Sequence, residues 1–312
     1  MGARSRDLLR RSCLAVPGSS DRFIERALTI PADMVFLDLE DSVAPSEKLE
    51  ARGRVARAIR SFDWGERVVC VRVNAWDTPL TLRDVIEVVT GAGPRLDEIM
   101  LPKVQRPDEV VALDLVLTQL EAELGLERGH IGIEAQIETT RGLINVEAIA
   151  TASSRLETLV FGPADFSASM QLPVLTGGAA IPEYPGDHFH YVLSKILMAA
   201  RTAGLQVIDG PFLRIHDLEG LKASALRSAM LGYDGKWALH PTQVDVLNDT
   251  YRPSQELFDR AVAILDAYEQ ATTSDRRGAV MFGDEMIDEA SRKMAEKFAL
   301  RGRRAGMTPS AS

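Results

Sequence analysis

Short apolar runs alternate with segments of helical periodicity along most of the 312-residue chain, and this alternation limits the possible folds more than any other feature. The runs with the composition of buried strands are 13–16, 34–39, 67–73, 98–101, 131–137, 158–161, 205–208 and 236–239. The helical segments are 21–29, 46–61, 80–90, 107–124, 140–153, 190–203, 218–231 and 254–270. Eight strand–helix units in about 270 residues match a closed parallel (β/α)8 barrel, or TIM barrel.

The main alternative to the barrel is an open, doubly wound sheet. Such sheets often bind dinucleotides through a Gly-x-Gly-x-x-Gly motif after the first strand, and the motif does not occur there. The sequence therefore favours the barrel, in which functional side chains gather where the carboxyl ends of the strands meet.

The far end of the chain predicts a second, smaller part. The helix at 254–270 is expected to complete the barrel, so the predicted catalytic domain covers residues 1–274. After a polar linker at 271–278, a short strand-like piece, a Gly-Asp turn and a helix at 287–300 predict a C-terminal lid module within 275–312. This module is too small to hold a core alone, so we expect it to dock on the barrel or on a neighbouring subunit. From residue 301 onward we expect a disordered tail.

Composition and charge exclude several classes of partner. A net charge of -9 and a pI near 5.2 argue against nonspecific binding to nucleic acid or to an anionic membrane surface. No apolar run reaches the ~18 residues of a membrane span. The Arg-rich start lacks the apolar core of a secretory signal, and we expect a solvated arm there. Cys13 and Cys70 lie in strand-like runs, which fits buried thiols in a reducing cytoplasm.

Two carboxylates stand where apolar strands end in Gly-containing loops. Glu138 follows the run 131–137, and Asp165 follows the run 158–161 after Gly-Pro-Ala. In a barrel both would face one mouth. Mg²⁺ prefers oxygen ligands and usually takes one or two protein carboxylates, which leaves positions open for substrate oxygens.

Three further acids follow the second strand within four residues. Asp38, Glu40 and Asp41 would repel one another, and a nearby cation or its water shell would relieve that repulsion. Capping of the next helix by Asp41 or Ser42 is the alternative. We favour a place for this cluster around the water shell of a metal.

Two cations at strand ends have alternative interpretations. Arg72 lies in an apolar strand, where it either pairs with a buried carboxylate or reaches an anionic ligand at the mouth. Lys103 either forms a Schiff base with a carbonyl substrate or pairs with one of the many acids, and the acid-rich surroundings favour pairing.

The loop after the first strand resembles a phosphate-binding turn. It reads Pro-Gly-Ser-Ser and opens a helix that carries Arg22 and Arg26 one turn apart. Ordinary capping by Ser20 or Asp21 with solvated arginines is the alternative. His240, at the end of the last strand, lines a ligand cleft or satisfies a loop carbonyl.

An ordered series of motifs resembles the citrate lyase beta-subunit-like group of the HpcH/HpaI aldolase/citrate lyase superfamily, and within it the malyl-CoA lyases. The motifs are Arg-Ser at 11–12, Val-Pro-Gly-Ser at 16–19, Asp-Leu-Glu-Asp-Ser-Val-Ala-Pro at 38–45, Val-Arg-Val-Asn at 71–74, Ile-Glu-Thr at 137–139, Gly-Pro-Ala-Asp-Phe at 162–166, Asp-Gly-Pro at 209–211 and Gly-Lys-Trp-Ala-Leu-His-Pro at 235–241. The similarity spans roughly residues 11 to 300, and the series is more specific than any single motif.

The resemblance implies a barrel enzyme that uses Mg²⁺, or Mn²⁺ in its place. Such an enzyme cleaves a 3-hydroxyacyl-CoA with a free carboxylate, such as L-malyl-CoA, β-methylmalyl-CoA or citramalyl-CoA, to an acyl-CoA plus glyoxylate or pyruvate, and also runs the condensation. By position, the metal ligands are Glu138 and Asp165, the residues that hold its waters are Glu40 and Asp41, and the contact to the reacting oxygens is Arg72. The backbone around Ala164 and Asp165 receives the α-keto acid, and CoA lies along Ala15, Ser20, Arg22, Arg26, Leu239 and His240.

The resemblance also implies a role for the C-terminal module. Glu-Met-Ile-Asp at 285–288 is similar to a lid sequence whose aspartate, here Asp288, acts as acid or base in the active site of a neighbouring subunit. A cytoplasmic homo-oligomer, trimer or hexamer, is therefore expected. The residues alone would make Asp288 an ordinary acid at a helix start.

Other activities stay open at this point. Residues 171–184 stand where malyl-CoA lyases carry a longer, aromatic-rich insertion, so the preferred acyl group is undecided, as is hydrolysis of the thioester after condensation. The alternatives are a citrate lyase beta subunit within a multi-subunit complex, a malyl-CoA thioesterase or malate synthase-like enzyme, and a Schiff-base aldolase that uses Lys103.

Overall fold

The computed structural model describes residues 8–176, 181, 183–273 and 279–310. Its internal contacts divide the chain into two units, Met1–Asp249 and Thr250–Ser312. The predicted N-terminal arm therefore lies largely outside the described residues, as does most of the predicted linker.

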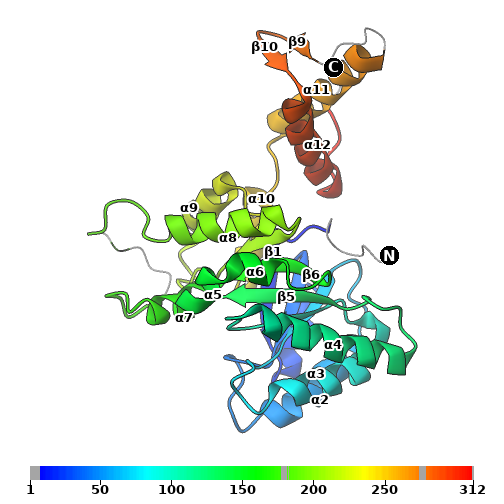
Figure 1. The fold of residues 1–312 in the computed structure, drawn as a ribbon, viewed down its shortest axis with the longest axis vertical. Coiled ribbons are helices and arrows are strands. Elements are labelled where there is room, and N and C mark those ends of the chain that lie inside the picture. The colour runs from blue at the N-terminus through cyan, green and yellow to red at the C-terminus, as the bar shows by residue number, and fades with distance from the viewer. Residues whose placement is uncertain (1–7, 177–180, 182, 274–278, 311–312) are drawn as a thin grey trace. The chain divides into compact units, whose positions relative to one another are not determined.

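The first unit is a closed barrel of eight parallel strands, which confirms the predicted fold (Figure 1). The strands are β1 (Ser12–Pro17), β2 (Met34–Asp38), β3 (Val68–Arg72), β4 (Glu98–Leu101), β5 (Gly132–Ile137), β6 (Leu156–Phe161), β7 (Gln206–Asp209) and β8 (Gly235–Ala238). Each pairs with its neighbour in sequence, and β8 closes on β1 with Lys236 opposite Ser12. All eight apolar runs form strands because both faces of a barrel strand are buried.

Helices cover the outside of the barrel. They are α1 (Asp21–Ala27), α2 (Lys48–Ser61), α3 (Thr81–Ala92), α4 (Pro107–Leu124), α5 (Thr140–Ile144), α6 (Val146–Ala150), α7 (Pro163–Ser169), α8 (His190–Thr202), α9 (Leu218–Leu231) and α10 (Val244–Thr250), with 3₁₀ turns η1 (Gly93–Arg95) and η2 (Pro241–Gln243). Helices α2, α3 and α4 lie side by side (Figure 1).

The segments after β5 and β6 differ from the sequence-based expectation. The predicted helix at 140–153 is divided at Asn145, whose side chain donates to the Gln105 carbonyl at 2.8 Å. The segment after β6, expected as a loop, begins a short helix, α7, with Pro163 in its first turn. Proline is well suited to this position because the first helical N–H groups have no partner within the helix. Asp165 is therefore held in a helical first turn.

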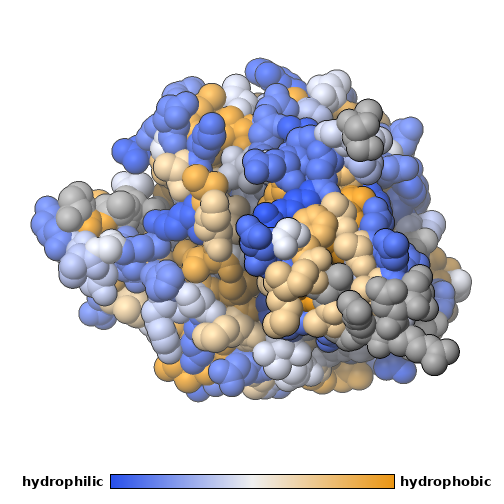
Figure 2. Space-filling model, turned by 90° about the horizontal axis from the view of Figure 1, so that it is seen from above, coloured by the Kyte–Doolittle hydropathy of each residue, from blue (hydrophilic) through white to orange (hydrophobic). Residues whose placement is uncertain are grey.

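Apolar side chains fill the interior of the barrel. Phe36 and Trp237 pack with ring centroids 4.5 Å apart, and both cysteines are buried and free. Among the described residues, no helix combines the length and hydropathy needed to cross a bilayer. The face drawn in Figure 2 mixes hydrophilic residues with smaller hydrophobic groups, which is ordinary for a folded chain.

A buried arginine occupies the amino-terminal end of the barrel. Arg10 is 1% exposed and contacts Glu98 and Gln206, the first residues of β4 and β7. Its guanidinium also lies 3.6 Å from Glu134 and 3.5 Å from Glu157. A buried cation needs such partners, because an unpaired charge is costly away from water.

Glu134 lies at the same amino-terminal end of the barrel, called the barrel floor below, and it makes the free energy of unfolding dependent on pH. Burial and the adjacent Glu98 raise the pKa of Glu134 well above its usual value. The folded chain therefore keeps a proton that the unfolded chain loses above its pKa of about 4.3, so stability falls as pH rises toward the folded pKa. We expect Glu134→Gln, which retains a donor toward Glu98, to unfold at least about 4 °C above the parent at pH 8. Thermal melts from pH 5 to pH 9 should show this difference shrinking toward pH 5, and parallel curves would contradict the assignment.

The second unit is built on a pair of helices. Helix α11 (Gln255–Thr273) is followed by a hairpin of β9 (Val280–Phe282) and β10 (Glu285–Ile287), and then by α12 (Glu289–Arg304). The helices meet through Ala261, Ala295 and Ala299. A Cβ at Gly302 would lie 2.1 Å from the Phe258 ring, so glycine permits this close packing.

This unit corrects two expectations. Helix α11 packs against α12, so the contacts group it with the C-terminal part, whereas the sequence assigned residues up to 274 to the barrel. Residues 301–304, expected to be disordered, form the last turn of α12. Arg301, Arg303 and Arg304 favour helix there because cations stabilise the carboxyl end of the helix dipole.

Candidate active site

Four carboxylates from three strand ends gather around Lys103 at the carboxyl-terminal mouth of the barrel. Glu40 and Asp41 follow β2, Glu138 follows β5, and Asp165 lies in α7 after β6. Nζ of Lys103, which follows β4, contacts Glu40 and lies 3.8 Å from an oxygen of Asp41 and 3.8 Å from an oxygen of Asp165. The four acids predicted to surround a metal are thus close to one another.

Glu138 is buried and held through both of its oxygens. Oε1 accepts from the backbone N–H of Lys103 at 2.7 Å, and Oε2 accepts from the side-chain amide of Gln136 at 2.6 Å. A Cβ at residue 162 would lie 2.3 Å from Oε2, so the carboxylate can sit here only because that residue is glycine. The carboxylate is fixed before any ligand arrives.

The surroundings of Glu138 oppose its negative charge. Burial raises its pKa to about 8, and the neighbouring Asp165 and Glu40 add to the effect. A divalent cation would offset both causes, because it supplies positive charge to a group that otherwise keeps a proton. Hard oxygen donors at a mouth open to substrate fit Mg²⁺ or Mn²⁺.

Arg72 is paired with acids of the neighbouring strand. Asp38 lies opposite Arg72 in the β2–β3 register and accepts two hydrogen bonds from it, each 2.7 Å long. Nη1 lies 3.0 Å from Glu40, and the guanidinium stands 5.3 Å from the Trp237 ring centroid. Burial opposes ionisation of Asp38, but Arg72 outweighs it and leaves the pKa below its usual value. Asp38 is therefore the main partner of Arg72, while Glu40 and Asp41 lie between Arg72 and Lys103.

Lys103 pairs with an acid, as the acid-rich surroundings predicted. Burial opposes its charge, but the hydrogen bond and charge of Glu40 outweigh burial and raise the pKa of the ammonium. A protonated amine does not attack a carbonyl, so this environment disfavours the Schiff-base alternative.

A second set of ligand-type side chains lies inside the barrel. Atoms of Cys70, Glu98 and Glu134 approach one another within 4.8 Å. Arg10 contacts both glutamates and brings the positive charge that a cation would supply. These three side chains therefore take part in the charge pairing that closes the amino-terminal end of the barrel.

A cavity of about 190 Å³ lies between β1 and the segment after β8. Four of the residues predicted to contact CoA line it together: Ala15, Arg26, Leu239 and His240. A guanidinium and an imidazole beside an apolar wall suit a ligand with anionic and apolar parts.

Two other predicted CoA contacts have local roles. Ser20 caps α1 by accepting from the Phe23 N–H, and the guanidinium of Arg22 lies 5.7 Å from the Phe23 ring centroid. Both fit the alternative of an ordinary helix start. His240 bonds Thr242 through Nδ1, at 2.9 Å, while it lines the cavity.

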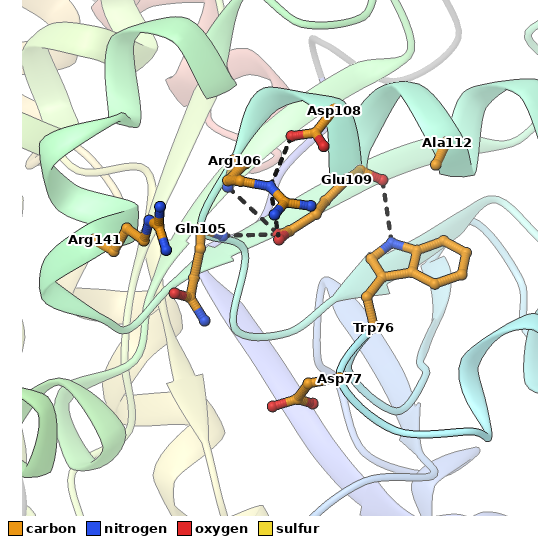
Figure 3. A pocket seen from close by; sticks show the side chains of 8 residues that line it. All are labelled: Trp76, Asp77, Gln105, Arg106, Asp108, Glu109, Ala112 and Arg141. Carbon is orange, nitrogen blue, oxygen red and sulfur yellow. Dashed lines mark hydrogen bonds and ion pairs between the residues drawn. The ribbon is translucent and has the colours of Figure 1, made fainter.

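A pocket of about 500 Å³, lined by residues that follow β3, β4 and β5, was not predicted from the sequence (Figure 3). It is lined by Trp76, Asp77, Gln105, Arg106, Asp108, Glu109, Ala112 and Arg141. Trp76 donates to the Glu109 carbonyl at 3.1 Å, and Arg106 lies 3.0 Å from Asp108. Figure 3 shows Trp76 and Arg141 on opposite sides of it. In the sequence, the only indication of this pocket was that its residues come shortly after the ends of β3, β4 and β5, the strands that also carry or precede Arg72, Lys103 and Glu138.

Sequence reasoning also missed side chains that hold the site residues in place. Gln136 donates to Glu138, and its position two residues earlier on the same strand could have indicated this. Lys48, on α2, donates to the Glu40 carbonyl at 2.7 Å and to the Asn74 side chain at 2.6 Å. No sequence pattern indicated Lys48, because its partners lie on other elements.

The chain is similar to known lyases over nearly its whole length. The model of the HpcH/HpaI aldolase/citrate lyase family matches residues 11–241. The L-malyl-CoA/beta-methylmalyl-CoA lyase of Rhodobacter capsulatus is 39% identical over 92% of this chain and 93% of its own. The citrate lyase subunit beta of Leuconostoc mesenteroides subsp. cremoris is 32% identical over 90% of this chain and 89% of its own.

A solved structure supports the same assignment. Protein CitE from Mycobacterium tuberculosis, in complex with magnesium, acetoacetate and coenzyme A, is 31% identical, with a TM-score of 0.72 over 97% of this chain and 100% of that chain. The sequence, the fold and the acids at the barrel mouth all point to the same family. The chain belongs to the HpcH/HpaI aldolase/citrate lyase family.

Proposed function

We propose that this protein is a magnesium-dependent carbon–carbon lyase. It cleaves a 3-hydroxyacyl-CoA with a free carboxylate, such as L-malyl-CoA, β-methylmalyl-CoA or citramalyl-CoA, to an acyl-CoA plus glyoxylate or pyruvate, and it catalyses the reverse condensation. The observation that carries the proposal is the set of acids around Glu138, whose burial and charged neighbours favour a bound divalent cation. The names of the relatives, which include a malyl-CoA lyase at 39% identity, support the substrate class.

The four acids would have two different roles at the metal. Glu138 and Asp165 would bind it directly, and Glu40 and Asp41 would orient its waters. When bound, Mg²⁺ or Mn²⁺ stabilises negative charge on the α-keto acid oxygens. The backbone around Ala164 and Asp165 would receive the keto-acid carboxylate.

Arg72 keeps N–H groups for the substrate. A guanidinium has five N–H donors, and Asp38 takes two of them. A remaining N–H can donate to the substrate oxygen on which charge develops. Because Asp38 and Glu40 fix the guanidinium, little reorganisation is needed when substrate binds.

Asp288 transfers the proton to and from the α-carbon of the acyl-CoA. It accepts from the Ser291 N–H at 3.0 Å, and this hydrogen bond lowers its pKa, so the group is a carboxylate in the free protein. In condensation it takes a proton from the acyl-CoA α-carbon, that carbon bonds to the keto carbon, and the new alkoxide takes a proton from solvent. Cleavage is the reverse and begins after Asp288 has taken up a proton from solvent: the hydroxyl loses its proton to solvent, the carbon–carbon bond breaks, and Asp288 gives its proton to the enolate carbon.

A portion of CoA would occupy the cavity beside Ala15, Arg26, Leu239 and His240, and Ser20 and Arg22 are its other proposed contacts. Arg26 offers charge to a phosphate, while Ala15 and Leu239 contact apolar portions.

The lid is proposed to act between subunits. Met281, Met286 and Met294 are 63%, 68% and 59% exposed, which suits a surface that contacts another chain. We infer a cytoplasmic homo-oligomer, trimer or hexamer, in which Asp288 of one copy completes the site of another.

Assay of the purified chain against a panel of CoA thioesters, with and without EDTA, tests metal dependence and acyl preference together. We expect release of glyoxylate or pyruvate that EDTA abolishes and added Mg²⁺ restores. Turnover that resists EDTA would exclude the metal-dependent reaction. Free CoA appearing together with malate would instead indicate thioester hydrolysis. No turnover by the isolated chain, with other proteins copurifying, would indicate a citrate lyase subunit.

A further inference from the structure

Lys103 has a backbone conformation that is rare for a residue with a side chain. Its φ is +53°, in the left-handed region that glycine normally occupies. The turn directs its N–H to Glu138 Oε1 at 2.7 Å, and the N–H of the next residue, Val104, bonds the Gln136 carbonyl at 3.1 Å. Strained backbone of this kind is kept only where its surroundings hold it, and such positions cluster at functional sites.

The side chain of Lys103 reaches the remaining acids. Nζ contacts Glu40 and lies 3.8 Å from both Asp41 and Asp165. The lysine side chain is 25% exposed and that of Glu40 is 7% exposed, so solvent screens their pairing only in part. One residue therefore contacts Glu138 through its backbone and the other three acids through its ammonium.

Lys103 is the cation whose ammonium reaches Glu40, Asp41 and Asp165 together. Arg72, the other cation at the mouth, forms two hydrogen bonds with Asp38, and its Nη1 lies 3.0 Å from Glu40 and 3.9 Å from Asp41. A divalent cation held by Glu138 and Asp165 would stand close to the Lys103 ammonium, and like charges at short range repel.

We infer that Lys103 is a resident counter-cation that competes with the divalent metal for the carboxylates and thereby sets the metal affinity of the site. This inference rests on the proposed function, because it takes the metal to bind between Glu138 and Asp165. Without metal, the ammonium holds the acids together. With metal, its repulsion weakens binding, so the ion exchanges readily with solvent.

Titration of the metal-free, full-length protein with Mn²⁺ in the absence of substrate, followed by electron paramagnetic resonance, tests this role. We expect Lys103→Met to bind Mn²⁺ at least about tenfold more tightly than the parent, because a nearby positive charge is gone. The metal-free variant should also unfold about 5 °C lower, since Glu40 loses a buried partner, and saturating Mn²⁺ should remove most of that difference.

Three further variants separate charge from structural damage. Lys103→Arg keeps the charge and should bind Mn²⁺ within about twofold of the parent. Lys103→Gln removes the charge but keeps a donor toward Glu40, and it should tighten binding as the Met variant does. Arg106→Met removes an exposed cation from the same loop, where it pairs with Asp108, and should leave affinity unchanged.

Tighter binding is a result that a merely damaged site would not give. Unchanged or weaker Mn²⁺ affinity in both Lys103→Met and Lys103→Gln would overturn the inference and make Lys103 an organiser of the ligands. Failure of the parent protein to bind Mn²⁺ would instead contradict the proposed metal site, so the two failures can be told apart.

Discussion

Glu138→Gln is expected to lose Mg²⁺ and Mn²⁺ binding and to lower turnover by at least about 1000-fold. The amide keeps the size of the side chain but cannot take up the negative charge, and metal stabilisation of a developing oxyanion contributes several kcal/mol. Asp165→Asn should behave in the same way. Isothermal titration with Mn²⁺, together with the thioester assay, measures both losses.

Glu134→Gln is the matched control for Glu138→Gln. It makes the same chemical change on the same strand, β5, but at a residue whose partners are Glu98 and Arg10 on the barrel floor. It should bind Mn²⁺ as the parent does. Stoichiometric Mn²⁺ binding by Glu138→Gln or by Asp165→Asn would show that the ligands have been assigned wrongly.

Asp288→Asn is expected to retain metal binding and to lower turnover by at least about 100-fold, the low end for loss of a general acid or base. The residue belongs to the second unit and is exposed, so its replacement should leave the barrel intact. Asp284→Asn, an acid four residues earlier on the hairpin turn, is the control and should keep near-normal rates. Near-normal turnover of Asp288→Asn would remove this residue from the mechanism.

Mixed oligomers show whether Asp288 acts within its own chain or on a neighbour. Each chain of a co-expressed pair, Glu138→Gln and Asp288→Asn, carries one defect. If the lid acts between subunits, a barrel with intact Glu138 can meet a lid with intact Asp288, and purified heteromers regain part of the activity. Heteromers that remain inactive would place each lid over its own barrel.

The barrel could be predicted from the sequence because each of its strands is a short apolar run between helical segments. Helix α7 could not be, since its few residues are too short to show helical periodicity and the Gly-Pro pair before it is also typical of a loop. The association of α11 with α12 was missed for another reason: an amphipathic pattern shows that a helix buries one face but does not identify the element that covers it.

The candidate site, too, could be predicted only in part. Positions at strand ends sufficed to place Glu40, Asp41, Glu138 and Asp165 at one mouth, because parallel strands end on one side of the barrel. The partner of Arg72 stayed open, since it depends on the β2–β3 register that sets Asp38 opposite it. Register is a property of packed strands and has no signature in a single sequence.

Arg10 connects the start of the chain to strands far along it, through contacts with Glu98 and Gln206. A shortened version that begins at Ser12 would retain every strand of the barrel, yet it would leave buried acids facing one another without their countercharge. Arg10 is therefore part of the folded barrel, and an expression clone trimmed to the first strand would be a poor choice for crystallisation or assay.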